Sequence, residues 1–326
     1  MHAYDMAPAD NLNLIERSAL ERAHFVVAVK GGPLGPICGL NSIERPDVIV
    51  TGLSSVENSG ELELGKIAQA LGIPWVVSAD DHRNWARPAA RGLVSHAILL
   101  VASNKDVPAA RAFGYGRAEY LGGPPLWQDW HRETERKRQY FLGGPIVLVG
   151  GNKNALITDQ VLAAVVEKMN DSGLPWGLIF KPHRRENEEV NPARRARILA
   201  DANLIAVEGR PSELLGIVDL VVVPAGSTLG IMAAHRRVPV IDFENEAIRR
   251  RLLEQDGTAD WFPAEAGASL RATAETLADV VKQLLTPEGA AELRRRQEEV
   301  YPDPPPGGER VETRIVRFLE NLVSNR

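Results

Sequence analysis

The chain contains one cysteine, Cys38, among its 326 residues. A single cysteine excludes an intramolecular disulfide and every zinc site that needs two cysteines. No window of the sequence approaches the roughly 18 uninterrupted apolar residues that a membrane-spanning helix needs. The start of the chain, Met1–Leu12, also lacks the basic stretch and the apolar run of a signal peptide. These absences predict a cytoplasmic protein without a transmembrane segment.

An excess of basic residues is lacking as well. The 38 lysines and arginines are outnumbered by 43 aspartates and glutamates, for a formal net charge of −5. The chain therefore has no domain-wide positive charge to neutralise nucleic-acid phosphates. The short basic runs at 183–189, 193–197 and 293–299 lie at helical spacing among acids, as solvated helix faces do. We expect no nucleic-acid partner.

What the sequence does contain is a regular alternation of predicted strands and helices. In the first half, apolar runs rich in β-branched residues predict the parallel strands His24–Lys30, Asp47–Gly52, Ile73–Ala79 and His96–Ala102. A helix is predicted over Glu61–Leu71, since Gly72 closes it and Pro74 prevents its continuation. The opening segment, Met1–Met6, is short and polar for a strand at a sheet centre. Either the chain starts late or its first strand is rudimentary.

The alternation stops at Gly122–Pro125 and a charged segment, Gln128–Gln139, and restarts after Gly144. The strands predicted in the second half are Pro145–Gly150, Trp176–Lys181, Leu204–Val207 and Asp219–Val223. The predicted helices are Thr158–Met169, a short one from Ser212, about Leu270 to Leu285, Glu288–Val300 and, past a Pro-Gly break, Glu309–Leu322.

This pattern predicts an α/β protein with two Rossmann-like doubly wound domains. We expect an N-terminal domain at 1–127, a linker at 128–144 and a C-terminal domain at 145–302. Residues 303–326 are expected to form a break and a last helix that can pack back on the first domain. Because two domains that are joined by a linker and recrossed after this break have few obligatory contacts, deletion of Glu309–Arg326 is expected to loosen their orientation and reduce solubility rather than unfold either core.

The most informative stretch is Asp219–Asn245, which predicts a strand, a small-residue turn, a short helix and a second strand. The turn contains Gly226, Ser227 and Thr228. A parallel strand that ends in such a turn directs helix N–H groups and a positive dipole end toward the carboxyl edge of the sheet. That arrangement suits a phosphate or diphosphate. The alternative is that Ser227 and Thr228 only cap the helix.

Two other predicted strands of the second half end in polar residues at the same edge. Gly151, Asn152 and Lys153 follow one of them, where a glycine turn lets the backbone approach a diphosphate. Lys181, His183 and Arg184 leave the other and can supply positive charge or hydrogen bonds. The alternatives are a plain strand-to-helix loop and a surface histidine in a charged loop.

In the first half, Asp80, Asp81 and His82 follow the strand Ile73–Ala79. Paired carboxylates raise one another's pKa and a histidine titrates near neutrality, so one of the three is a candidate catalytic base for an acceptor hydroxyl. The alternative is an Asx turn that caps the next helix. No third ligand lies at metal-binding spacing, so we expect no metal.

Three of these segments resemble motifs of the nucleotide-sugar enzymes with the GT-B fold. Lys181–Arg184 resembles the K-P-H-P-R element of glycerophosphotransferases and polysaccharide-synthesis transferases. Gly226–Gly230, with the following Ala233, Ala234 and Val238–Ile241, resembles the G-S-[ST]-x-x-x-E-A-A-x-x-G-x-P-V-I element of glycosyltransferases and UDP-N-acetylglucosamine 2-epimerases. Leu121–Pro125 resembles the V-x-G-N-P segment that precedes the interdomain linker in those families.

The resemblance implies two Rossmann-like domains that face a cleft, with the nucleotide on the C-terminal domain and the acceptor on the N-terminal one. It implies a glycosyltransferase that uses a nucleotide-diphosphate sugar of the UDP type as co-substrate, an unidentified acceptor, and no cofactor. Met232 stands where these families often carry a ribose-binding glutamate, which moves that role to Glu244 or Glu246. A UDP-N-acetylglucosamine 2-epimerase-like enzyme and a non-catalytic nucleotide- or sugar-binding relative remain as alternatives. The acceptor and the oligomeric state stay open.

Overall fold

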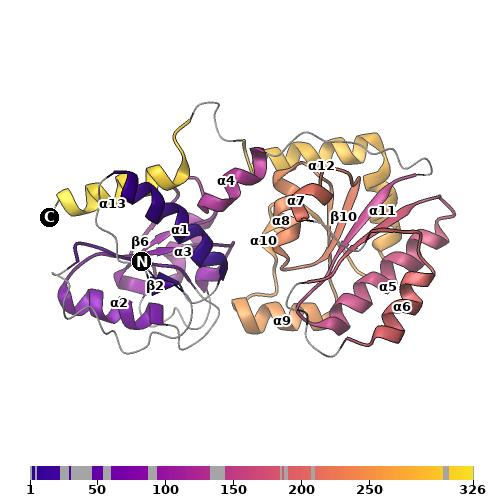
Figure 1. Cartoon of the computed structure of the whole chain (residues 1–326), viewed down its shortest axis with the longest axis horizontal. Helices are drawn as coiled ribbons and strands as arrows, with labels where there is room; N and C mark the ends of the chain where they lie inside the picture. The colour runs from indigo at the N-terminus through magenta and orange to yellow at the C-terminus, as the bar shows by residue number, and fades with distance from the viewer. Residues whose placement is uncertain are drawn as a thin grey trace. The chain divides into compact units, whose positions relative to one another are not determined.

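The computed structural model describes residues 2–3, 6–22, 29–30, 46–53, 60–86, 94–132, 144–183, 186, 190–206, 210–303 and 308–325. The chain divides into two compact units, whose helices and strands are labelled in Figure 1. Unit 1 comprises Met1–Asp129, Gln255–Gly257 and Pro305–Arg326, and unit 2 comprises Trp130–Glu254 and Thr258–Pro304.

Unit 1 is built on a six-stranded parallel sheet in the order β2-β1-β3-β4-β5-β6. Its strands are β1 His2–Ala3, β2 Val29–Lys30, β3 Ile49–Thr51, β4 Trp75–Ser78, β5 Ala97–Leu100 and β6 Arg117–Glu119. The two-residue β1 pairs with both β2 and β3 in the interior of the sheet. The opening strand is therefore present, although it has only two residues.

Helices cover both faces of this sheet. They are α1 Met6–Glu21, α2 Gly60–Leu71, α3 Asp106–Phe113 and α13 Val311–Ser324, whereas α4 Pro125–Arg132 spans the boundary between the two units. Successive side chains of a strand point to opposite faces. Trp75 and Val77 of β4 accordingly join one hydrophobic cluster with α2 and α3, whereas Val76 joins another with α1 and α13.

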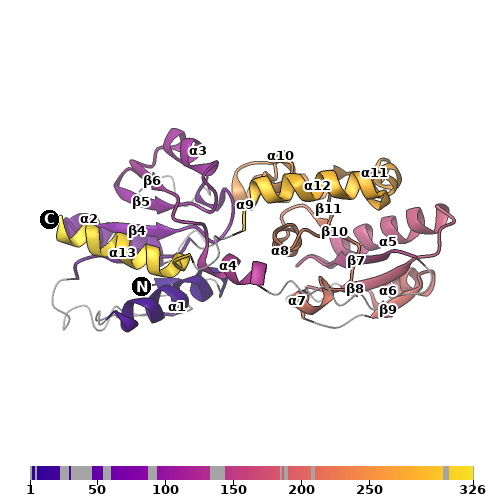
Figure 2. The same ribbon diagram turned by 90° about the horizontal axis from the view of Figure 1, so that it is seen from above.

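The C-terminal helix α13 is part of the unit 1 core. It lies beside α1, although the two are at opposite ends of the sequence (Figure 2). Ile315 and Val316 are fully buried against Leu12 and Ile15 of α1. Its apolar face thus completes one side of the sheet in the domain on which it was expected to pack, so deletion of the helix should destabilise that core rather than leave it intact.

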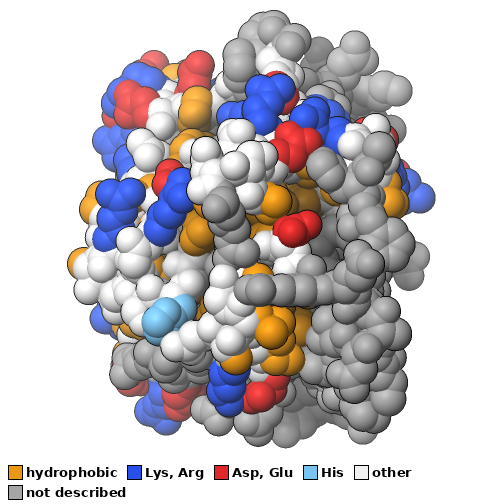
Figure 3. Space-filling model, turned by 90° about the vertical axis from the view of Figure 1, so that its left-hand side faces the viewer, with side chains coloured by type: hydrophobic (Ala, Val, Ile, Leu, Met, Phe, Trp, Pro, Cys, Tyr) orange, Lys and Arg blue, Asp and Glu red, His pale blue; other side chains and the backbone are white. Residues whose placement is uncertain are grey.

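Charges of both signs lie together on the surface of unit 1. Over the described part of the face in Figure 3, Lys and Arg side chains alternate with Asp and Glu, with hydrophobic side chains between them. Exposed ion pairs of this unit include Arg22 with Glu320 at 2.6 Å and Arg117 with Glu119 at 2.8 Å. Such pairs contribute little to stability.

Unit 2 holds a second six-stranded parallel sheet, in the order β12-β11-β10-β7-β8-β9. Its strands are β7 Ile146–Gly150, β8 Gly177–Lys181, β9 Leu204–Ala206, β10 Leu220–Pro224, β11 Val240–Phe243 and β12 Leu270–Ala272. The helix predicted from about Leu270 is wrong in its first residues. They pair with β11 as a strand, and the helix begins only at Leu277.

The helices after these strands are α5 Ala155–Asp171, α6 Pro192–Ala200, α7 Pro211–Leu214, α8 Thr228–His235, α9 Glu246–Asp256, α10 Phe262–Glu265, α11 Leu277–Leu285 and α12 Pro287–Val300. Each unit is thus a doubly wound α/β domain, which confirms the predicted fold class. No helix in the described ranges is both long and apolar enough to cross a membrane.

Candidate functional site

Three segments of unit 2 meet at the carboxyl edge of its sheet, because β7 lies between β8 and β10. The Gly151 N–H donates to the Lys181 carbonyl at 2.8 Å. A Cβ on Gly151 would lie 2.7 Å from the His183 nitrogen, and one on Gly150 would lie 2.8 Å from Leu229 Cδ2 of α8. The structure therefore brings together the predicted glycine loop, the end of β8 and the start of α8.

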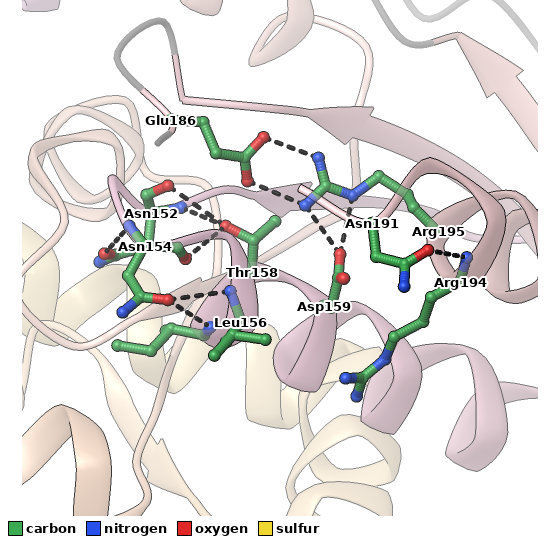
Figure 4. A network of polar contacts seen from close by, with 10 residues as sticks. Asn152, Asn154, Leu156, Thr158, Asp159, Glu186, Asn191, Arg194 and Arg195 are labelled. Atoms are coloured by element: carbon green, nitrogen blue, oxygen red, sulfur yellow. Dashed lines mark hydrogen bonds and ion pairs between the residues drawn. The ribbon is translucent and has the colours of Figure 1, made fainter. Parts of the chain in front are cut away.

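The loop between β7 and α5 is held by its own side chains (Figure 4). The Asn152 N–H donates to Thr158 Oγ1 at 2.8 Å, and the Asn152 side-chain oxygen accepts from the Asn154 N–H at 3.0 Å. Asn154 caps α5, since its side chain accepts from the N–H groups of Leu156 and Ile157. The side-chain oxygen of Asn152 is thus engaged within the loop, whereas Lys153 is exposed.

The turn before α8 has the conformation that its glycine allows. Gly226 has a φ of +90°, which L side chains rarely adopt. Ser227 occupies the N-cap position of α8 in extended conformation but makes no side-chain capping hydrogen bond. Ser227 is half-buried and Thr228 is exposed. The hydroxyl of Ser227 is thus not committed to the first turn of the helix, unlike an ordinary cap.

The end of β8 carries the basic residues of the site. Lys181, paired with Gly150 in the sheet register, is half-buried, as is His183. The His183 carbonyl accepts a hydrogen bond from the Glu186 N–H at 3.0 Å. Arg184 lies outside the described residues.

Two carboxylates follow one another along β11 and its exit. Glu244 is buried, and its Oε1 lies 3.4 Å from Arg271 Nε. Asp242 is buried beside it and accepts a hydrogen bond from Ser269. The predicted ribose ligand Glu244 is thus held by an arginine of the neighbouring strand. The other candidate, Glu246, is exposed at the start of α9.

Asp242 is a residue that the sequence reasoning missed. Burial raises the pKa of its carboxyl to about 7, with Glu244 adding to the rise and Ser269 and Arg271 opposing it. Its Oδ1 makes no hydrogen bond to any described residue. A carboxylate inside the apolar run Val240–Phe243 was the available sequence signal.

In unit 1, the three predicted catalytic residues point to different surroundings. The His82 side chain is fully buried, with Nδ1 3.1 Å from Asp106 Oδ2 and its ring 5.1 Å from that of Trp127. Burial lowers the pKa of His82, against the effect of Asp106. Asp80 accepts from the Asn84 amide, and Asp81 Oδ1 accepts from the His82 N–H at 2.7 Å.

The three residues of this cluster, Asp80, Asp81 and His82, differ in how deeply they are buried. Asp80 and Asp81 are half-buried, whereas His82 is enclosed by residues of α3 and α4. Asp106 and Trp127 were not identified from the sequence. Across the described chain, no three His, Cys, Asp or Glu side chains gather where they can hold a metal ion.

Comparisons with known proteins rest on structure. No protein-family model matches the sequence, and no curated protein matches it. The S. aureus MnaA–UDP structure aligns with a TM-score of 0.63 at 12% identity, covering 99% of this chain and 97% of that chain. A Siraitia grosvenorii UGT transferase in complex with UDP aligns with a TM-score of 0.61 at 11% identity. That alignment covers 98% of this chain and 99% of the other chain.

A Listeria monocytogenes structure described as a UDP-N-acetylglucosamine 2-epimerase aligns with a TM-score of 0.61 at 12% identity. The alignment covers 99% of this chain and 81% of that one. At identities this low the likeness concerns the fold alone. The chain has the GT-B fold that these solved structures share and that its sequence predicts.

Proposed function

We propose that the chain is a glycosyltransferase-type enzyme that uses a nucleotide-diphosphate sugar, with the diphosphate at the carboxyl edge of the unit 2 sheet. The observation that carries this proposal is the approach of Gly151 to the end of β8 and of Gly150 to the start of α8. Two structures of the same fold hold UDP, which favours a uridine nucleotide.

The chemistry follows from these groups. Departure of a nucleoside diphosphate requires stabilisation of negative charge on its phosphates. The N-terminus of α8 supplies N–H groups and a positive dipole end, and Ser227 adds a hydroxyl that makes no capping hydrogen bond. Lys181 and Lys153 add positive charge at the ends of β8 and β7. These groups can act without a metal.

On the acceptor side, we propose Asp80 or Asp81 as the general base. Both carboxylates follow β4 and are half-buried, whereas His82 is enclosed and held by Asp106. We assign His82 the role of fixing the segment that carries the two aspartates.

Epimerisation of the sugar is the second candidate reaction. The Listeria structure described as an epimerase has the same fold, which favours this alternative. Incubation with UDP-N-acetylglucosamine separates the two reactions, because transfer of the sugar to an acceptor hydroxyl, or to water where no acceptor is added, releases UDP, whereas epimerisation yields an isomeric UDP-sugar. A protein that binds UDP but forms neither product, with or without added acceptor alcohols, would support a non-catalytic relative.

The binding site is tested with a Ser227→Ala/Thr228→Ala double variant and calorimetric titration with UDP. The variant should bind UDP more weakly by about 1 to 3 kcal/mol, the range for lost hydrogen bonds to a charged group. Its melting temperature should stay unchanged, because Ser227 makes no capping bond.

Thr286→Ala is the matched control, because Thr286 does cap its helix, accepting from the Gly289 N–H at 3.0 Å. It should lower stability by about 1 kcal/mol and leave UDP affinity unchanged. Unchanged affinity in a folded double variant would remove the phosphate assignment. CDP, GDP and dTDP in the same titration identify the base.

A further inference from the structure

Two consecutive buried residues of α5 hold two different segments of the candidate site. Thr158 Oγ1 accepts from the Asn152 N–H and donates to the Asn152 carbonyl at 3.2 Å, which fixes the loop after β7. Asp159, the next residue, accepts from Arg195 Nε at 2.7 Å. Figure 4 shows Arg195 reaching from α6 toward both Asp159 and Glu186.

Arg195 is at the centre of a nearly enclosed ionic group. Its Nη1 and Nη2 donate to the two oxygens of Glu186 at 2.6 and 2.9 Å. The side chains of Arg195, Glu186 and Asp159 are 11%, 9% and 1% exposed. The guanidinium also lies over the Phe180 ring of β8, 5.4 Å from its centroid. This fork-to-fork geometry is specific to arginine.

The ionic group is connected to the end of β8 by backbone hydrogen bonds. The Glu186 N–H donates to the His183 carbonyl, and the Lys181 carbonyl accepts from the Gly151 N–H. The His183 nitrogen lies where a Cβ on Gly151 would meet it at 2.7 Å. Backbone contacts thus link Glu186 to His183, and the end of β8 to the glycine loop.

Stability alone does not account for this group. Burying one cation with two carboxylates costs desolvation, and well-packed apolar residues at such positions are often equally or more stabilising. No residue of α6 is fully buried, so polar contacts contribute much of its attachment to α5, and another such contact is Asn170 Nδ2 donating to the carbonyl of the C-cap residue Asp201 at 2.8 Å. The ionic group of Arg195, Asp159 and Glu186 therefore fixes the position of α6 relative to α5 and Glu186, which the packing of α6 alone would not fix.

We propose that Arg195 is a positioning residue which, through Asp159 and Glu186, sets Lys181 and His183 relative to Gly151–Lys153 and so shapes the diphosphate site. This inference rests on the proposed function for the identity of the ligand. The coupling between the end of β8 and the loop after β7 does not depend on the proposed function, and it can be measured without a ligand.

The test compares Arg195→Lys with Arg194→Lys, the same substitution one residue earlier on the exposed side of α6. Lysine keeps the charge but cannot bridge both carboxylates. Arg195→Lys should weaken UDP binding by about tenfold or more while affinity for uridine, which lacks phosphates, is unchanged. Arg194→Lys should change neither affinity. Glu186→Gln provides a second variant should Arg195→Lys fold poorly.

Amide hydrogen exchange without nucleotide is the second measurement. In Arg195→Lys, exchange should accelerate at Gly151 and Glu186 and stay unchanged at Val222 of β10. Equal losses of UDP and uridine affinity, or unchanged UDP affinity with unchanged exchange, would overturn the inference. If the wild-type protein binds no nucleotide, the proposed function fails, and the exchange result alone supports or overturns the coupling.

Discussion

Asp242 is an ionisable side chain whose surroundings oppose its charge. It lies in β11 of a fully buried parallel strand pair, and only Ser269 donates a hydrogen bond to it among the described residues. Gly230 of α8 packs over the same face, with Asp242 Oδ1 3.6 Å from the position of a Cβ on that glycine. A buried carboxylate with so few donors favours the protonated form.

Asp242→Asn should therefore change how stability depends on pH. The carboxyl titrates near 3.8 when unfolded and near 7 when folded, so its stabilising effect is present below pH 4 and is lost as pH rises to about 7. The asparagine variant should lack this loss and exceed the wild type at pH 8 by up to about 4 kcal/mol. Urea unfolding from pH 4 to pH 8 measures it.

Asp279→Asn, which removes an exposed carboxylate of α11, is the control and should keep the wild-type pH dependence. If the free energies of unfolding of the wild type and of Asp242→Asn changed equally between pH 4 and pH 7, the assignment would be contradicted.

Gly151→Ala should separate the two segments that meet at the candidate site. The new methyl group would lie 2.7 Å from the His183 nitrogen and 3.1 Å from Pro182 Cα, both backbone atoms that cannot rotate away. Overpacking of this kind costs about 1 to 3 kcal/mol. Thermal unfolding should show the loss of stability, and calorimetric titration should show weakened UDP binding.

Lys153→Ala, at the exposed tip of the same loop, should weaken UDP binding while the stability of the protein stays at the wild-type level.

At the scale of elements, hydrophobic pattern predicted the buried strands best. β4, β5, β7, β8 and β10 lie within or almost within their predicted ranges, because fully buried parallel strands are continuous apolar runs. The edge strands β6 and β12 were missed or taken for helix, since a three-residue strand such as Arg117–Glu119 has no apolar run. Its conformation comes from pairing with β5, which only the tertiary structure supplies.

The C-terminal helix provides the element-scale prediction. Ile315 of α13 is 1% exposed in the cluster with Leu12 and Ile15. Ile315→Ala should destabilise unit 1 by about 2 to 5 kcal/mol, the range for large-to-small changes in a core. Leu20→Ala, on α1 but 54% exposed, should change stability by no more than about 0.5 kcal/mol. Equal effects of the two variants in urea unfolding would mean that α13 is peripheral.

At the scale of the whole molecule, the sequence identified loops but not their partners. The segments around Gly151, Lys181 and Gly226 were found because each follows a strand with small or basic residues. The pairings that fix the candidate residues were not found, because His82 and Asp106 are separated by 24 positions of sequence and Asp159 and Arg195 by 36. No local pattern encodes such pairings, which depend on how helices pack on the sheet.

Two sheets with separate cores predict two unfolding transitions in calorimetry. UDP should raise only the transition of unit 2, since a ligand stabilises the part that binds it by mass action. Ile315→Ala should lower only the transition of unit 1, and Arg195→Lys should reduce the shift that UDP produces in unit 2. A single transition that moves as a whole with both the ligand and Ile315→Ala would instead mean that the two units unfold cooperatively.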